Sequence, residues 1–150
     1  MKYVVVPENV YFRYDGQPVH DQNGKPVVWS HEKFVSEFIC TSPTMNRGGG
    51  DGLRRVVKML RLFESAKAGD VIGIEDADYK VARSVVDSIE WPAPIMRFAH
   101  QMLPHVEAWE HAEKHDEAWK KEYDVEHSKK PALRAVEDPV AADDEAPKAG

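Results

Sequence analysis

The sequence has a single cysteine, no long apolar run and fewer basic than acidic residues. Cys40 stands alone in 150 residues, which excludes an internal disulfide and favours a reducing compartment. The opening MKYVVVPE has too short an apolar run for a signal peptide, and no later stretch approaches the roughly 18 apolar residues of a membrane span. We therefore expect a cytoplasmic protein with no membrane partner.

The charge balance argues against a protein that wraps nucleic acid. The chain has 20 Lys and Arg residues against 26 Asp and Glu residues, and its pI is near 5.6. Its length suits one domain with a core of its own. We predict a single α+β domain over residues 1–128. Residues 129–150 are predicted to be a flexible, disordered acidic tail, because they hold three prolines and few large apolar residues.

The first 29 residues alternate β-branched residues with turn signals. Val10, Phe12 and Tyr14 recur at every second position, which is typical of a strand with one buried face. The dipeptides Asp15-Gly16 and Asn23-Gly24 tolerate the positive φ of tight hairpin turns. This pattern predicts a small N-terminal antiparallel β-meander that packs against three to four helices.

Helical periodicity dominates the rest of the domain. The predicted helices cover residues 31–39 behind a Ser30 cap, residues 51–66, residues 75–89 and residues 95–103. DVIGI, before the third helix, predicts a short strand. Pro104 either kinks the last helix or opens another one.

Four glycines fall within five positions in NRGGGDGLRRVVKML, which raises the question of a phosphate-binding loop. A P-loop needs a buried strand before it and a Lys-Ser/Thr pair after it, whereas here a polar, proline-broken segment precedes and Leu53 follows. A dinucleotide fingerprint fails because it also requires a preceding strand. We interpret Gly48 to Gly50 as a joint and Asp51 as the N-cap of the next helix.

That helix carries an unusual density of cations. Its predicted core stripe consists of Leu53, Val56, Val57, Leu60 and Phe63. The candidate partner-binding residues are Arg54, Arg55, Lys58 and Arg61. These cations form either a solvated helix surface or a docking face for phosphate or an acidic partner. No aromatic residues alternate with them, which disfavours binding of single-stranded nucleic acid.

Histidines gather near the end of the domain. His111 and His115 are four residues apart, a spacing that lets two imidazoles on one helix share a metal ion. HAEKH is not the HExxH motif, however, and spacing fixes no third ligand. Whether this pair binds metal is left open. We predict no catalytic residue, no metal site and no cofactor, and we interpret Cys40 as a small buried hydrophobe.

Several segments resemble small uncharacterised proteins encoded by tailed bacteriophages. The resemblance covers about residues 1–112 and is carried by FVSEF, by AGDVIGIEDADYKVARSVV and by RFAHQMLPHVEAW. These motifs have no known catalytic role, so no site residue is transferred from that family. The resemblance implies virion assembly or an accessory role in the host cytoplasm.

The sequence thus predicts a non-enzymatic protein–protein interaction module, in phage morphogenesis or an accessory role, with other phage or host proteins as partners. The alternative is a nucleic-acid-associated regulator that uses the basic helix over residues 54–61. A metal-dependent enzyme that uses His111 and His115 comes third. The oligomeric state does not follow from the sequence.

Overall fold

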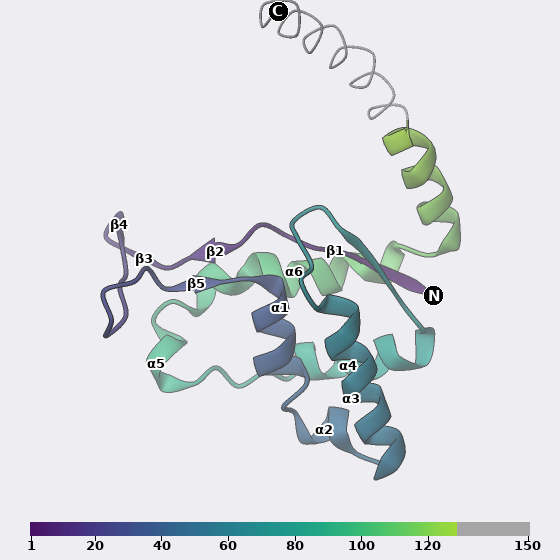
Figure 1. The fold of residues 1–150 in the computed structure, drawn as a ribbon, viewed down its shortest axis with the longest axis horizontal. Coiled ribbons are helices and arrows are strands. Elements are labelled where there is room, and N and C mark those ends of the chain that lie inside the picture. The colour runs from purple at the N-terminus through teal and green to yellow at the C-terminus, as the bar shows by residue number, and fades with distance from the viewer. Residues whose placement is uncertain (129–150) are drawn as a thin grey trace, which may run out of the picture. The chain divides into compact units, whose positions relative to one another are not determined.

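The computed structural model describes residues 1–128 and has an α+β fold, as the sequence predicts (Figure 1). The chain divides into two compact units after His115, inside the predicted domain of residues 1–128, and each unit is described by itself. Within residues 1–128, all strands lie in Met1–His115. The second unit begins with a helix over residues 117–128. The predicted acidic tail, residues 129–150, lies outside the described residues.

The strands form three antiparallel pairs in place of one continuous meander. The pairs are β1 (Lys2–Val5) with β6 (Val71–Ile74), β2 (Val10–Tyr11) with β5 (Val28–Trp29), and β3 (Arg13–Tyr14) with β4 (Gln17–Pro18). Asp15 and Gly16 have φ angles of 54° and 80°, so the Asp-Gly turn forms as predicted. β6 confirms the strand expected at DVIGI.

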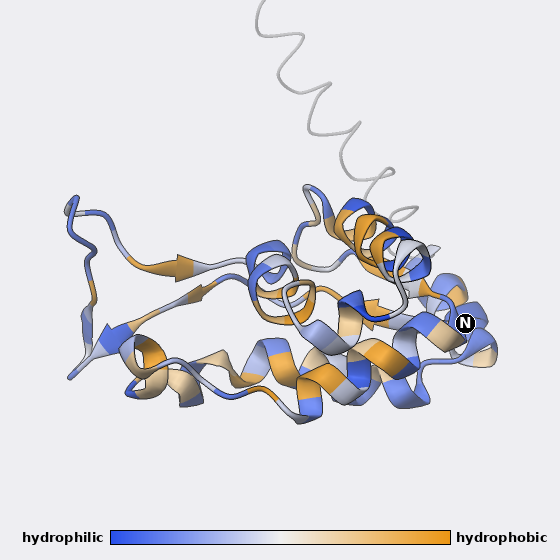
Figure 2. Cartoon of the chain, turned by 90° about the horizontal axis from the view of Figure 1, so that it is seen from below, coloured by the Kyte–Doolittle hydropathy of each residue, from blue (hydrophilic) through white to orange (hydrophobic). Residues whose placement is uncertain are grey.

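The helical segments connect and cover these strands. They are α1 (His31–Phe34), η1 (Val35–Ile39), α2 (Pro43–Asn46), α3 (Gly50–Phe63), α4 (Asp76–Asp87), α5 (Ala93–Met96), η2 (Ala99–Met102), α6 (Leu103–His111) and η3 (Ala112–Lys114). Orange and blue bands alternate along these helices in Figure 2, as expected for amphipathic helices. No helix among residues 1–128 is long and apolar enough to cross a membrane.

Helix ends follow the sequence signals at some sites and depart from them at others. The Ser30 hydroxyl accepts a hydrogen bond from the Lys33 amide at 3.1 Å and caps α1 as predicted. The predicted helix over 31–39 is helical throughout, but its second half, η1, is a π-helix. Asp51 is not the cap of α3. Gly49 holds that place, and Asp51 lies in the first turn.

The helix predicted over residues 95–103 is instead two short turns, α5 and the 3₁₀ helix η2. Pro104 lies in the first turn of α6, where its missing N–H leaves no helical bond unmade. It therefore opens a second helix, which settles the alternative left by the sequence.

One apolar core fills Met1–His115. Its largest fully enclosed side chains are Trp109, Phe12, Phe34, Phe63, Ile39, Met45, Met59, Ile74 and Met102. α4 turns one apolar face to this core, because Tyr79, Ala82, Val85 and Val86 are all buried. Two histidines, His31 and His105, are enclosed in the same core.

Candidate docking face

The face that α3 turns to the core matches the predicted stripe only in part, with Phe63 buried as predicted. Gly52, Met59 and Phe63 are its buried residues, and Val56 and Val57 are half-buried. Leu53 is 64% exposed and Leu60 is 40% exposed, so the prediction of both as core residues is wrong. The reason is Gly52, which has no side chain and lets the helix lie directly against the backbone of Asn46 and Arg47.

The outward side of α3 therefore combines apolar and cationic side chains. We call Leu53, Arg54, Val57, Leu60 and Arg61 the docking face. Leu53, Val57 and Leu60 follow each other at spacings of four and three, so they form one seam along the helix. Arg54 and Arg61 border the seam on one side, since each lies about 100° around the helix from the leucine before it.

The four candidate cations do not share one environment. The Arg54 guanidinium lies 2.7 Å from the Asp51 carboxylate, and both side chains are well exposed. Arg61 makes no ion pair or side-chain hydrogen bond with any residue of 1–128. An exposed ion pair such as Arg54–Asp51 is worth little and yields easily to a new partner. These two arginines are open to a ligand.

Arg55 and Lys58 instead hold elements of the domain together. The Arg55 guanidinium donates to the Met45 carbonyl at 3.0 Å and lies 3.7 Å from Asp78. The Lys58 ammonium lies 2.6 Å from Glu75 and 3.3 Å from Asp78. The hydrogen bond to Glu75 is the main reason that the Lys58 pKa is raised. Of the four candidates, Arg54 and Arg61 are therefore the two whose side chains do not bridge to another helix of residues 1–128.

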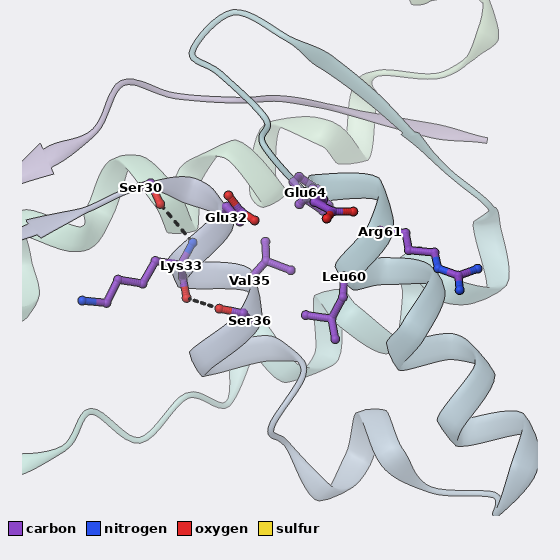
Figure 3. Close-up of a pocket in the computed structure, with 9 residues that line it drawn as sticks. Ser30, Glu32, Lys33, Val35, Ser36, Leu60, Arg61 and Glu64 are labelled. Carbon is purple, nitrogen blue, oxygen red and sulfur yellow. Dashed lines mark hydrogen bonds between the residues drawn. The ribbon is translucent and has the colours of Figure 1, made fainter.

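Two shallow grooves meet along the docking face. One, of about 490 Å³, lies between α3 and the α1–η1 segment, and its lining includes Lys33, Val35, Leu60 and Arg61. Figure 3 shows Val35 and Leu60 pointing into the space between the two helices, while Arg61 extends to the outer side. The second groove runs along the outer side of α3 and is lined by Leu53, Arg54, Val57, Lys58, Arg61 and Leu62. Arg61 borders both grooves.

Electrostatics differ between the two grooves. The first holds Glu32 and Glu64 besides its cations, so its charge is mixed. Every charged side chain of the second is basic. A ligand that crosses the seam therefore meets positive charge on one side and mixed charge on the other.

No signal in the sequence indicates a buried hydrogen-bond network formed by two histidines and two tryptophans in the core. The Trp109 indole N–H donates to His31 Nε2 at 3.0 Å, His31 Nδ1 lies 2.9 Å from His105 Nδ1, and His105 Nε2 lies 2.9 Å from the Trp29 carbonyl. Because the indole can only donate, His31 Nε2 carries no proton. His31 Nδ1–H then donates to His105, whose Nε2–H donates to Trp29.

Every donor and acceptor in this hydrogen-bond network has a partner only when both imidazoles are neutral. Burial, and to a lesser extent the neighbouring His105, lowers the pKa of His31 to about 3. Burial also lowers the pKa of His105, against the opposing effect of its bond to the Trp29 carbonyl. Periodicity could not reveal this hydrogen-bond network, because its residues come from α1, α6 and the end of β5.

The other sequence candidates do not form a reactive cluster. His111 ends α6 and His115 follows η3, so the two do not lie on one α-helix, and His115 Nδ1 lies 3.1 Å from the Tyr3 carbonyl. No group of three or more His, Cys, Asp or Glu side chains among residues 1–128 could hold a metal ion. Cys40 is buried, and burial raises the pKa of its thiol to about 11.

Comparison with protein-family models, with curated proteins and with solved structures finds no match for this chain.

Proposed function

We propose that this chain is a non-enzymatic protein–protein interaction module that binds a partner through the docking face of α3. The observation that carries the proposal is the exposure of Leu53 and Leu60, at 64% and 40%, on the side of α3 that faces away from the core. Apolar side chains that gather beside open cations are typical of a contact surface, because water solvates such a seam poorly.

The cellular setting of the proposal comes from the resemblance to tailed-phage proteins over residues 1–112. That resemblance supports a role in phage morphogenesis or as an accessory protein in the host cytoplasm. Assembly proteins act by contact, so a small domain with an exposed apolar seam suits this role. The partner would then be another phage protein or a host protein.

The buried titratable groups support a module without chemistry of its own. The Cys40 thiol stays protonated at neutral pH, since its pKa is about 11, and the thiol is a poor nucleophile in that form. His31 and His105 lie in the core, where their ring nitrogens are used by each other, by Trp109 and by Trp29. Proton transfer to a substrate would require breaking this chain of bonds.

A nucleic-acid-associated regulator is less well supported. Lys58 and Arg55 are held by carboxylates of α4 and its cap, so the row of cations open to phosphate is shorter than the sequence suggested. A seam of leucine and valine contributes nothing to phosphate contact, which needs positive charge and hydrogen-bond donors. The same residues contribute directly to a protein interface.

Affinity capture followed by reconstitution with the purified partner tests the proposal. We expect Leu53→Ser with Leu60→Ser to abolish binding while the far-UV spectrum is kept and the melting temperature falls by no more than a few degrees, because neither side chain is buried. Met96→Ser with Leu103→Ser is the matched control, since these side chains are 58% and 52% exposed outside the docking face. This control should bind as well as the wild type.

The outcome that contradicts the proposal is a partner that binds the seam variant and the control variant equally. Binding to duplex DNA or RNA that falls steeply with salt and is lost in Arg54→Glu with Arg61→Glu would favour the nucleic-acid alternative. A protein partner should show a much weaker salt dependence.

A further inference from the structure

The docking face also constrains the shape of what it binds, and this inference rests on the proposed function. Leu53, Val57 and Leu60 have the four-three spacing that one helix shows to another in side-by-side packing. An extended strand places side chains of one face about 6.8 Å apart, which matches the steps of about 6 and 4.5 Å along this seam less well than a helix does. Leu53 and Val57 line the outer groove and Leu60 lines the groove beside α1–η1, so a helix packed along the seam would lie over both grooves.

The two arginines beside the seam determine which partner helices can bind. Arg54 and Arg61 are seven residues apart, about 10.5 Å along the axis, and both lie on the same side of the seam. A helix with two carboxylates at the same seven-residue spacing would meet both guanidinium groups at once. Each contact would be a charge-assisted hydrogen bond, which adds direction as well as energy.

A second copy of this chain does not fit this requirement. Two α3 helices packed antiparallel about Val57 would bring the Arg54 of each copy close to the Arg61 of the other. Like charges at such a contact oppose association. The groove on the α1–η1 side adds Glu32 and Glu64, so a matching helix would carry a basic residue on its opposite flank.

We propose that the docking face binds an amphipathic α-helix of a protein partner, whose apolar stripe covers Leu53, Val57 and Leu60 and whose carboxylates pair with Arg54 and Arg61. This is helix-in-groove recognition, in which apolar anchors provide affinity and flanking charges fix orientation.

The test uses two synthetic helical peptides and the full chain. Both peptides carry leucines at four-three spacing; one has Glu at the two flanking positions and the other has Lys there. We expect calorimetry to show that the Glu peptide binds at least about ten times more tightly, since the Lys peptide would meet Arg54 and Arg61 with like charge. Arg54→Glu with Arg61→Glu should invert this preference.

Lys25→Glu with Lys80→Glu is the control, because it makes the same change of net charge at exposed positions outside the docking face. It should keep the wild-type preference. If neither peptide binds, or both bind equally, or the preference does not invert, the helical partner is wrong. The proposed function fails separately, when a natural partner still binds the Leu53→Ser, Leu60→Ser variant.

Discussion

At the scale of single residues, Gly52 determines how closely α3 approaches α2. A Cβ atom at this position would lie 2.2 Å from the Asn46 carbonyl oxygen and 2.5 Å from that of Arg47. Both contacts are with backbone atoms, which cannot rotate away as the end of a flexible side chain can. We predict that Gly52→Ala destabilises the domain by about 2 kcal/mol, measured by chemical denaturation.

Gly50→Ala is the control for this prediction. Gly50 is already helical, and an added Cβ there would meet only the flexible end of Arg54, at 3.5 Å. The substitution should leave stability unchanged or raise it by up to about 1 kcal/mol, because alanine loses less backbone entropy on folding. Equal destabilisation by both substitutions would show that close approach at Gly52 is not the cause.

The buried histidines predict a loss of stability in acid. His31 has a folded pKa of about 3, below its ordinary value of 6.5, so the unfolded chain binds more protons as the pH falls. The contribution of neutral His31 to the free energy of unfolding is complete above about pH 6.5 and is lost progressively as the pH falls toward 3. Between pH 6.5 and 4.5 the loss in the free energy of unfolding should be about 2 kcal/mol for His31 alone.

Denaturation at a series of pH values measures this effect, and His31→Gln provides the comparison. Glutamine can still accept the Trp109 bond but does not titrate, so the variant should lose less stability between pH 6.5 and 4.5 than the wild type. An identical pH dependence in both proteins would mean that carboxylates dominate acid unfolding. Titration of the His31 ring near its ordinary pKa would contradict the buried neutral chain directly.

At the scale of elements, Lys58 joins α3 to α4 through Glu75 and Asp78, whereas Arg61 makes no such contact within residues 1–128. We predict that Lys58→Glu lowers the melting temperature, because it sets a third carboxylate beside two others. Arg61→Glu, on the same helix, should leave it unchanged. Equal melting temperatures would show that solvent screens the Lys58 contacts completely.

Element type was predictable from the sequence where one pattern dominated. α4 alternates apolar and polar residues at helical spacing, the sequence predicts a helix there, and Tyr79, Ala82, Val85 and Val86 form its buried face. α3 has apolar residues on two sides, so periodicity alone could not choose between the Leu53 side and the Met59 side. A glycine carries no hydrophobic signal, and Gly52 decided the choice through a tertiary contact.

The candidate site was predictable only in part for a related reason. The sequence indicates that α3 is rich in cations. Which of them are paired inside the domain and which stay exposed depends on the carboxylates of α4 and its N-cap. Arg55 forms an ion pair with Asp78, and Lys58 forms one with Glu75. Both carboxylates lie more than ten residues further along the chain. The exposed leucines appeared in the sequence as core. Their role as a seam follows only from the orientation of the helix.

At the scale of the whole molecule, the boundary after His115 predicts where the chain can be shortened. His115 supports β1, since its carbonyl accepts the Tyr3 amide at 3.0 Å and its Nδ1 lies 3.1 Å from the Tyr3 carbonyl. Ala112 is fully buried in the core. A fragment of residues 1–115 keeps these contacts, and a fragment of residues 1–111 loses them.

We therefore predict that residues 1–115 fold alone and melt within a few degrees of the full chain, whereas residues 1–111 melt clearly lower. The short fragment removes the two hydrogen bonds between His115 and the Tyr3 backbone and opens the core at Ala112, and each loss destabilises the folded state. Thermal unfolding followed by circular dichroism measures both fragments. If the 1–115 fragment is unfolded or melts as low as 1–111, residues beyond His115 stabilise the first unit, and the boundary is not one of independent folding.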